Sequence, residues 1–202
     1  MDYIDFLITV ISSSFLLIPT YFGMYMLKFR DIRRMFLYYL FSLYLCVVYW
    51  LTGPPDITYF RWDPGVSMIP LRDMVGDLRS TVLNIAMFLP LGIGLPLLWK
   101  KYGSFSKTVI FGLLTSLGIE VAQLFTYRAT DINDLLTNVT GTALGYFVYK
   151  AVFRKPHTQE KDHAPLLLLI SCIVMFFAEP FVYNVFYRLI TNFINTGPIM
   201  PI

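Results

Sequence analysis

The chain has 202 residues, of which 56% are hydrophobic and only 14% are charged, and its formal net charge is +3. A soluble domain would carry about 25% charged residues, so this composition, with a mean hydropathy of +0.61, excludes an ordinary soluble protein. The small positive charge does not indicate nucleic-acid binding, because the basic residues gather in loops between apolar segments. The composition therefore predicts a polytopic membrane protein with no separate soluble domain.

Six apolar segments predict an all-α fold of six transmembrane helices, because each is close to the length of about 20 residues that a bilayer requires. In chain order, they cover about residues 4–27, 35–51, 81–99, 108–125, 135–153 and 164–183. The longest polar interval, residues 56–80, contains an apolar patch too short to cross, so we expect a re-entrant or interfacial segment there. Residues 184–202 are expected to form an interfacial tail.

The distribution of lysine and arginine gives the orientation. With the N-terminus outside, eleven of these residues fall in cytoplasmic loops and five on the outer side. Cytoplasmic loops of membrane proteins carry an excess of basic residues. We therefore predict that the N-terminus, the 56–80 interval and the loop between the fourth and fifth helices face outward.

The stretch 116–145 holds polar and ionisable residues at a depth where each costs about 2.5–3.5 kcal/mol on insertion scales. On the fourth helix, the spacing of four and three residues places these side chains on one face: Ser116, Glu120 and Gln123. On the fifth, a seam with spacings of three and four consists of Asp131, Asp134, Asn138, Gly141 and Gly145. Several costly groups kept together predict a functional site.

Helix geometry predicts how these faces meet. At a rise of about 1.5 Å per residue, Glu120 and Asn138 are expected at similar depths below the outer surface, and Asn84 of the third helix can join them. The pair Gly141 and Gly145 would let another helix approach closely, which also makes a homo-oligomer through these glycines possible.

With these motifs in their order and spacing, the chain resembles the VanZ-like family, small membrane proteins named for a teicoplanin-resistance factor. The motifs are Ile69-Pro70-Leu71, Asn84-x-x-x-Phe88-x-Pro90-Leu91-Gly92, Ser116-x-x-x-Glu120-x-x-Gln123, Arg128-x-x-Asp131-x-x-Asp134 and Asn138-x-x-Gly141-x-x-x-Gly145. The resemblance covers about residues 35–183, so residues 1–34 are interpreted as an additional helix and basic loop. It implies a bacterial plasma-membrane protein linked to reduced glycopeptide sensitivity.

Three functions remain open for the outward-facing cluster. As a binding protein for a membrane lipid or a cell-wall lipid precursor, it would use Arg72 and Arg128 for phosphate or carboxylate, and Asp131 and Asp134 as acceptors. As an intramembrane enzyme acting on such a lipid, it would use Glu120 as general acid or base, assisted by Asp134. As a transporter of lipid or a small solute, it would line a path with Asn84, Glu120 and Asn138.

A purely structural alternative also applies, because Glu120, Gln123 and Asn138 could form hydrogen bonds between helices without binding any ligand. No metal site is predicted, because the spacing of the carboxylates matches no calcium loop, and no cofactor is expected. Both histidines lie in the predicted cytoplasmic loop, so no Ser-His-Asp set can form at the outer side.

Overall fold

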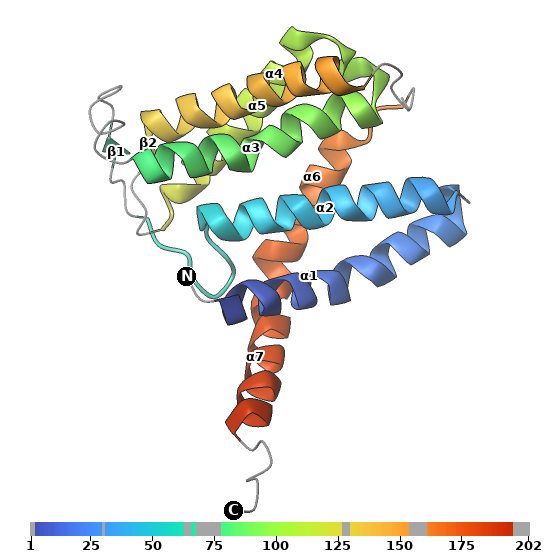
Figure 1. The fold of residues 1–202 in the computed structure, drawn as a ribbon. Helices are drawn as coiled ribbons and strands as arrows, with labels where there is room; N and C mark the ends of the chain where they lie inside the picture. Colours follow the sequence, from blue (N-terminus) through green and yellow to red (C-terminus); the bar gives the residue numbers. More distant parts are fainter. Residues whose placement is uncertain are drawn as a thin grey trace, which may run out of the picture. The chain divides into compact units, whose positions relative to one another are not determined.

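The computed structural model describes residues 3–29, 31–62, 66–67, 78–126, 130–153 and 161–195. The helices run in chain order as α1 Tyr3–Met24, α2 Ile32–Thr52, α3 Leu78–Leu98, α4 Phe105–Gln123, α5 Ile132–Val152, α6 Ala164–Ile173 and α7 Glu179–Asn195 (Figure 1). π-helical turns follow α1 at Tyr25–Phe29 and join α6 to α7 at Val174–Ala178. Because α6 and α7 are continuous through that turn, the described chain forms six helical rods.

The structure confirms the predicted all-α polytopic membrane fold. In the described ranges, five helical stretches are long and apolar enough to cross a membrane: Tyr3–Leu27, Ile32–Thr52, Leu78–Leu98, Phe105–Gln123 and Ala164–Asn192. Helix α5 is not among them although it has 21 residues, since its buried face includes polar residues such as Asn133, Thr137 and Asn138. That α5 crosses the membrane, and that the N-terminus lies outside, remain predictions.

The C-terminal helix differs from its predicted length. The sequence pattern predicts that the sixth span ends near Tyr183, but the helix continues to Asn195. Beyond Tyr183 polar residues recur among the hydrophobic ones, so the composition changes although the helix does not end there. The interfacial placement of the tail remains a prediction.

The chain divides into two compact units. Unit 1 comprises Met1–Leu51, Asp56–Thr58 and Leu167–Ile202, and unit 2 comprises Thr52–Pro55 and Tyr59–Leu166. In unit 1, α1 packs against α7. Buried hydroxyl groups link its helices, with the Tyr21 hydroxyl bonded to Ser42 Oγ and the Ser171 hydroxyl donating to the Ser42 carbonyl oxygen.

In unit 2, helices α3, α4 and α5 pack side by side (Figure 1). Glycines bring α3 and α5 into backbone contact. A Cβ atom added at Gly141 would lie 2.3 Å from the Ile85 carbonyl oxygen, and one at Gly145 would lie 2.1 Å from that of Leu89. These glycines therefore admit a helix of their own chain, and an oligomer through them stays a prediction.

Two short strands tie part of the 56–80 interval to the start of α5. Strand β1, Val66–Ser67, pairs in parallel with β2, Thr130–Asp131, and Val66 lies opposite Thr130. That the interval is re-entrant or interfacial stays a prediction, because residues 68–77 lie outside the described residues.

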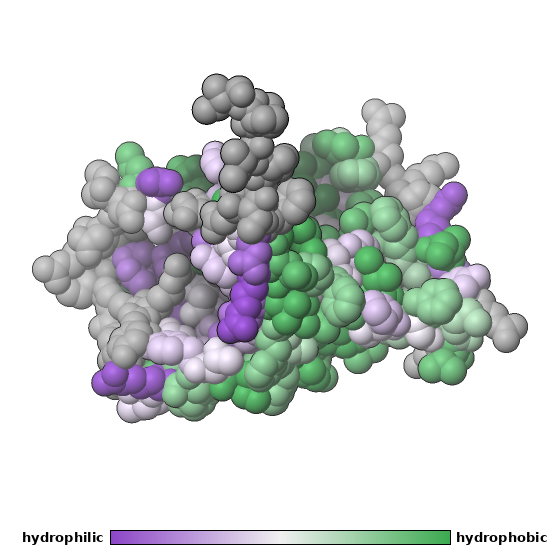
Figure 2. Space-filling model, turned by 90° about the horizontal axis from the view of Figure 1, so that it is seen from below, coloured by the Kyte–Doolittle hydropathy of each residue, from purple (hydrophilic) through white to green (hydrophobic). Residues whose placement is uncertain are grey.

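The exposed surface fits a lipid environment. Large hydrophobic side chains are exposed along the helices, as at Phe22 (64%), Val82 (62%) and Leu114 (61%). On the face drawn in Figure 2, hydrophobic residues cover broad areas and hydrophilic residues form smaller patches. In water such hydrophobic areas would promote aggregation, whereas in a bilayer they contact acyl chains.

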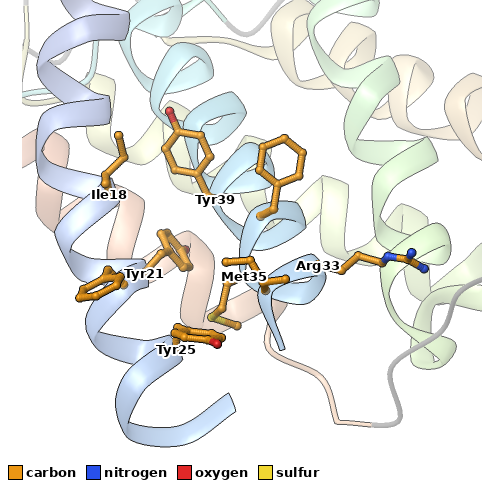
Figure 3. A pocket seen from close by; sticks show the side chains of 9 residues that line it. Ile18, Tyr21, Tyr25, Arg33, Met35 and Tyr39 are labelled. Atoms are coloured by element: carbon orange, nitrogen blue, oxygen red, sulfur yellow. The ribbon is translucent and has the colours of Figure 1, made fainter. Parts of the chain in front are cut away.

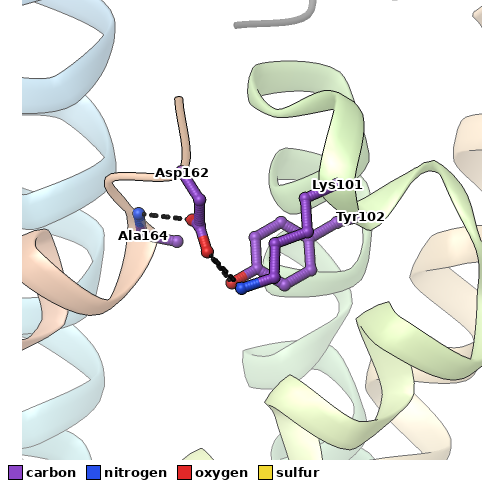
Figure 4. A network of polar contacts seen from close by, with 4 residues as sticks. All are labelled: Lys101, Tyr102, Asp162 and Ala164. Carbon is purple, nitrogen blue, oxygen red and sulfur yellow. Dashed lines mark hydrogen bonds and ion pairs between the residues drawn. The ribbon is translucent and has the colours of Figure 1, made fainter. Parts of the chain in front are cut away.

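A polar network joins the turn between α3 and α4 to the start of α6, all within unit 2 (Figure 4). One carboxylate oxygen of Asp162 accepts hydrogen bonds from Lys101 Nζ at 2.7 Å and from the Tyr102 hydroxyl at 2.9 Å. Its other oxygen accepts from the backbone N–H of Ala164 at 3.0 Å and so caps α6. Burial, together with the bond to Asp162, raises the pKa of Tyr102 well above its usual range.

Candidate functional site

The predicted site residues on α4 lie on one buried face, as their spacing indicated. Ser116 is fully buried, and Glu120 and Gln123 are each 4% exposed. Since α4 is one of the helices able to cross a membrane, the carboxyl group of Glu120 is enclosed by protein within a span. A buried carboxylate is stable only where donors compensate for the lost water.

The loop before α5 supplies such a donor to Glu120. The backbone N–H of Asp131 donates to Glu120 Oε2 at 3.0 Å, and the Thr130 hydroxyl donates to the Glu120 carbonyl oxygen at 3.0 Å. Residues Thr130 and Asp131 are held in extended conformation by the β1–β2 pairing. Backbone geometry in this loop therefore sets the position of the Glu120 carboxyl group.

The third helix, α3, contacts α5 through Asn84. Asn84 Nδ2 donates to Asp134 Oδ1 at 2.7 Å, across the packed faces of α3 and α5. The glycine contacts described above hold these helices close enough for the short amide and carboxylate side chains to meet. Asp134 thus has a fixed orientation in the first turn of α5.

Asn138 of α5 is joined to α4 by a hydrogen bond. Asn138 is 2% exposed, and its Nδ2 donates to Ser116 Oγ at 2.9 Å. It therefore pairs with a residue one helical turn from Glu120, not with Glu120 itself. The similar depth expected for Glu120 and Asn138 stays a prediction.

Gln123 and Asp131 both have structural partners within the chain. Gln123 Nε2 donates to the Thr52 carbonyl oxygen at 2.7 Å, at the end of α2. The side chain of Asp131 accepts from the Asn133 N–H at 2.9 Å as the N-cap of α5. These contacts do not test ligand binding by Gln123 or Asp131, which stays a prediction.

Among the described residues, two side-chain amides of the site donate a hydrogen bond through nitrogen and leave their oxygen without one. Within the described part of the chain, Gln123 Oε1 and Asn138 Oδ1 are buried and have no hydrogen-bond partner. An unsatisfied buried acceptor costs about 1–3 kcal/mol. Together with the Glu120 carboxyl group, these atoms would be complemented by a ligand that carries hydroxyl, amide or amine donors.

Two residues predicted to bind the ligand, Arg72 and Arg128, lie outside the described residues. Within the described residues, no group of three or more His, Cys, Asp or Glu side chains could hold a metal ion. The other six of the eight predicted site residues lie within the described part of the chain: Asn84, Glu120, Gln123, Asp131, Asp134 and Asn138. Hydrogen bonds join Asn84 to Asp134 and Asp131 to Glu120.

A second buried carboxyl group was missed at the sequence level. Glu179 lies in the long C-terminal span of unit 1, is 8% exposed, and its Oε1 accepts from the Ser12 hydroxyl at 3.0 Å. The argument from the cost of a charge in a membrane applies to Glu179 as much as to Glu120. It could have been found by that signal, since it stands alone in an otherwise apolar run.

Comparison with known proteins identifies a family and a curated relative. The VanZ/LLP1 family model matches residues 4–154, which includes the whole polar site. The chain is 27% identical over 141 residues to "Protein VanZ" of Enterococcus faecium, covering 67% of this chain and 87% of that protein. No solved structure matches the chain.

Proposed function

Because the chain belongs to the VanZ/LLP1 family, we propose that it is a bacterial plasma-membrane protein that lowers sensitivity to teicoplanin-type glycopeptides. It does so by binding a cell-envelope lipid or lipid-linked wall precursor at the polar site of unit 2. The resemblance of the motifs to the VanZ-like family supports the link to glycopeptides. The geometry of the site supports binding as the mode of action.

One observation carries the binding proposal. Glu120 is 4% exposed and is held by the Asp131 N–H, and the buried Gln123 Oε1 and Asn138 Oδ1 have no partner in the described ranges. This set of acceptors matches a headgroup rich in donors, such as the sugar hydroxyls and peptide N–H groups of a wall precursor. Arg72 and Arg128 are proposed to hold its phosphate groups.

A second candidate is an intramembrane enzyme, and the Asn84–Asp134 contact favours it. At 2.7 Å, this bond orients one carboxylate oxygen, which is how positioned general bases are held. In this case, Glu120 would exchange a proton with the lipid and Asp134 would assist. A transport path is less well supported, because beyond Asn138 the α3–α5 interface is closed by backbone contacts at Gly141 and Gly145.

The test separates binding from catalysis by isosteric substitution. In a strain whose teicoplanin resistance depends on this protein, Glu120→Gln should keep resistance if the site only binds, because a Gln oxygen can still accept from Asp131 N–H. Arg128→Ala should abolish it by removing the phosphate contact. Loss of resistance in Glu120→Gln, with normal membrane abundance and lipid binding, would support the enzyme instead.

Glu179→Gln is the matched control, because it makes the same change at a buried carboxyl group of unit 1. It should leave resistance unchanged. The ligand class can be read from mass spectrometry of lipids that co-purify with the wild type but not with Arg128→Ala. If Glu120→Leu and Arg128→Ala both retain full resistance, the polar site is not the functional site.

A further inference from the structure

Unit 1 contains a hollow of about 560 Å³ between the C-terminal half of α1 and the beginning of α2. Its volume lies within the range of about 300–1,000 Å³ that is usual for small-molecule sites. Figure 3 shows side chains of the two helices facing each other across it. None of the residues of the polar site lines the hollow.

The lining is apolar and aromatic. Tyr21 and Met35, each 3% exposed, are its buried residues, while Ile18, Phe22 and Phe36 are 57%, 64% and 58% exposed. The Tyr21 hydroxyl is already bonded to Ser42, so the Tyr21 ring is fixed and its polar atom is satisfied. The remaining surface suits a hydrocarbon chain.

One end of the hollow carries a positive charge. Arg33, in the first turn of α2, lines it and is exposed, and its side chain extends away from the apolar residues (Figure 3). In the described part of the chain, Asp31 forms its ion pair with Arg34, at 3.6 Å, and no ion pair involves Arg33. A long cationic side chain in this position can keep its stem on apolar surface and its head at the membrane boundary.

The sequence around the hollow adds to this charge. Residues 28–34 include Lys28, Arg30, Arg33 and Arg34 against the single Asp31, a net charge of +3. The loop is predicted to be cytoplasmic, and the cytoplasmic leaflet is the anionic one. An apolar hollow that ends at such a loop is complementary to a lipid with acyl chains and a negative headgroup.

We propose that this hollow binds an anionic phospholipid of the cytoplasmic leaflet, with an acyl chain against Tyr21 and Met35 and the phosphate at Arg33. The site differs from the proposed ligand site of unit 2 in its chemistry, and it is formed by residues of unit 1. It would anchor the α1–α2 hairpin to anionic membrane regions. Its failure would leave the proposed function of the polar site untouched.

The experiment uses native mass spectrometry of the full-length protein with phosphatidylglycerol and phosphatidylcholine added in equal amounts. The wild type should retain one phosphatidylglycerol in preference to phosphatidylcholine. Arg33→Gln should reduce that preference about fivefold, the effect of one interfacial charge. Arg188→Gln, the matched change at an exposed arginine of α7 that does not line the hollow, should not reduce it.

A second pair of variants tests the hollow itself. Ile18→Trp places bulk against the hollow and should remove the retained lipid, whereas Ile11→Trp, on α1 but not lining it, should keep it. Equal melting temperatures of the two variants establish that both are folded. Equal preference in Arg33→Gln and Arg188→Gln, or full retention in Ile18→Trp, would overturn the proposal, as would a dimer that replaces the lipid.

Discussion

The close packing of α3 and α5 makes Gly145 a sensitive position, and Gly145→Ala should destabilise the protein. An added Cβ would lie 2.1 Å from the Leu89 carbonyl oxygen, and contacts below 3.0 Å essentially never occur. The helices must therefore separate by about 1 Å, against an interface whose other close contacts resist movement. Overpacking of this kind costs about 1–3 kcal/mol.

The chain offers a matched control for this substitution. Gly118 is a helical glycine of α4 that is exposed, and an added Cβ there meets nothing within 4 Å. Gly118→Ala should stabilise the protein by about 0.5–1 kcal/mol, because alanine restricts the unfolded chain and favours helix. The two variants make the same chemical change with opposite expected signs.

The assay is thermal unfolding of the purified protein in one detergent. For a chain of this size, about 2–4 °C of melting temperature corresponds to 1 kcal/mol, so the two variants should differ by about 3–16 °C. Gly145→Ala should also weaken the Asn84–Asp134 contact, since that bond spans the same interface. A melting temperature for Gly145→Ala equal to or above that of Gly118→Ala would refute the backbone packing argument.

Two further predictions follow from contacts of unit 2, and one follows from the predicted membrane orientation. A double-mutant cycle of Asn84→Ala and Asp134→Ala, read by thermal unfolding, should give a coupling of about 0.6–2 kcal/mol for an interhelical hydrogen bond, and additive losses would mean that the bond contributes nothing. In a cysteine-free background, a cysteine at Thr130 should react with an impermeant thiol reagent from outside and one at Gln159 should not; the reverse pattern would invert the predicted orientation. The pKa of Tyr102 is raised in the folded state, so its hydroxyl ionises first in the unfolded chain, and its contribution to stability should be complete below pH of about 10 and decline above it. The melting temperature of the wild type should therefore exceed that of Tyr102→Phe by less above pH of about 10 than below it. A difference that does not change with pH would contradict this.

Much of the candidate site is predictable from the sequence because helical spacing is regular. The three- and four-residue intervals place Glu120 and Gln123 on one face of α4, and the glycines mark where α5 meets another helix. The cost of polar groups inside a membrane marks the cluster as unusual, since several such groups stand close together in the chain. Burying Glu179 in a membrane span costs as much, but no other charged residue stands near it in that span, so it forms no cluster that the sequence pattern would indicate.

Register and partner choice required the tertiary structure. Spacing along α4 and α5 could not determine that Asn138 meets Ser116 while Glu120 meets the Asp131 N–H, because spacing within one helix does not give its register against another. Nor could it show that Gln123 bonds to the end of α2, which is a contact between residues 71 positions apart in the chain.

The amino-acid sequence by itself determined that this is a helical membrane protein with a costly polar cluster, because hydrophobicity and helical period are local properties of the chain. The tertiary structure decided which polar groups meet and which helix contacts Gly141 and Gly145. It also revealed the hollow between α1 and α2. Those features depend on distances between segments far apart in the sequence, and only the packed helices fix such distances.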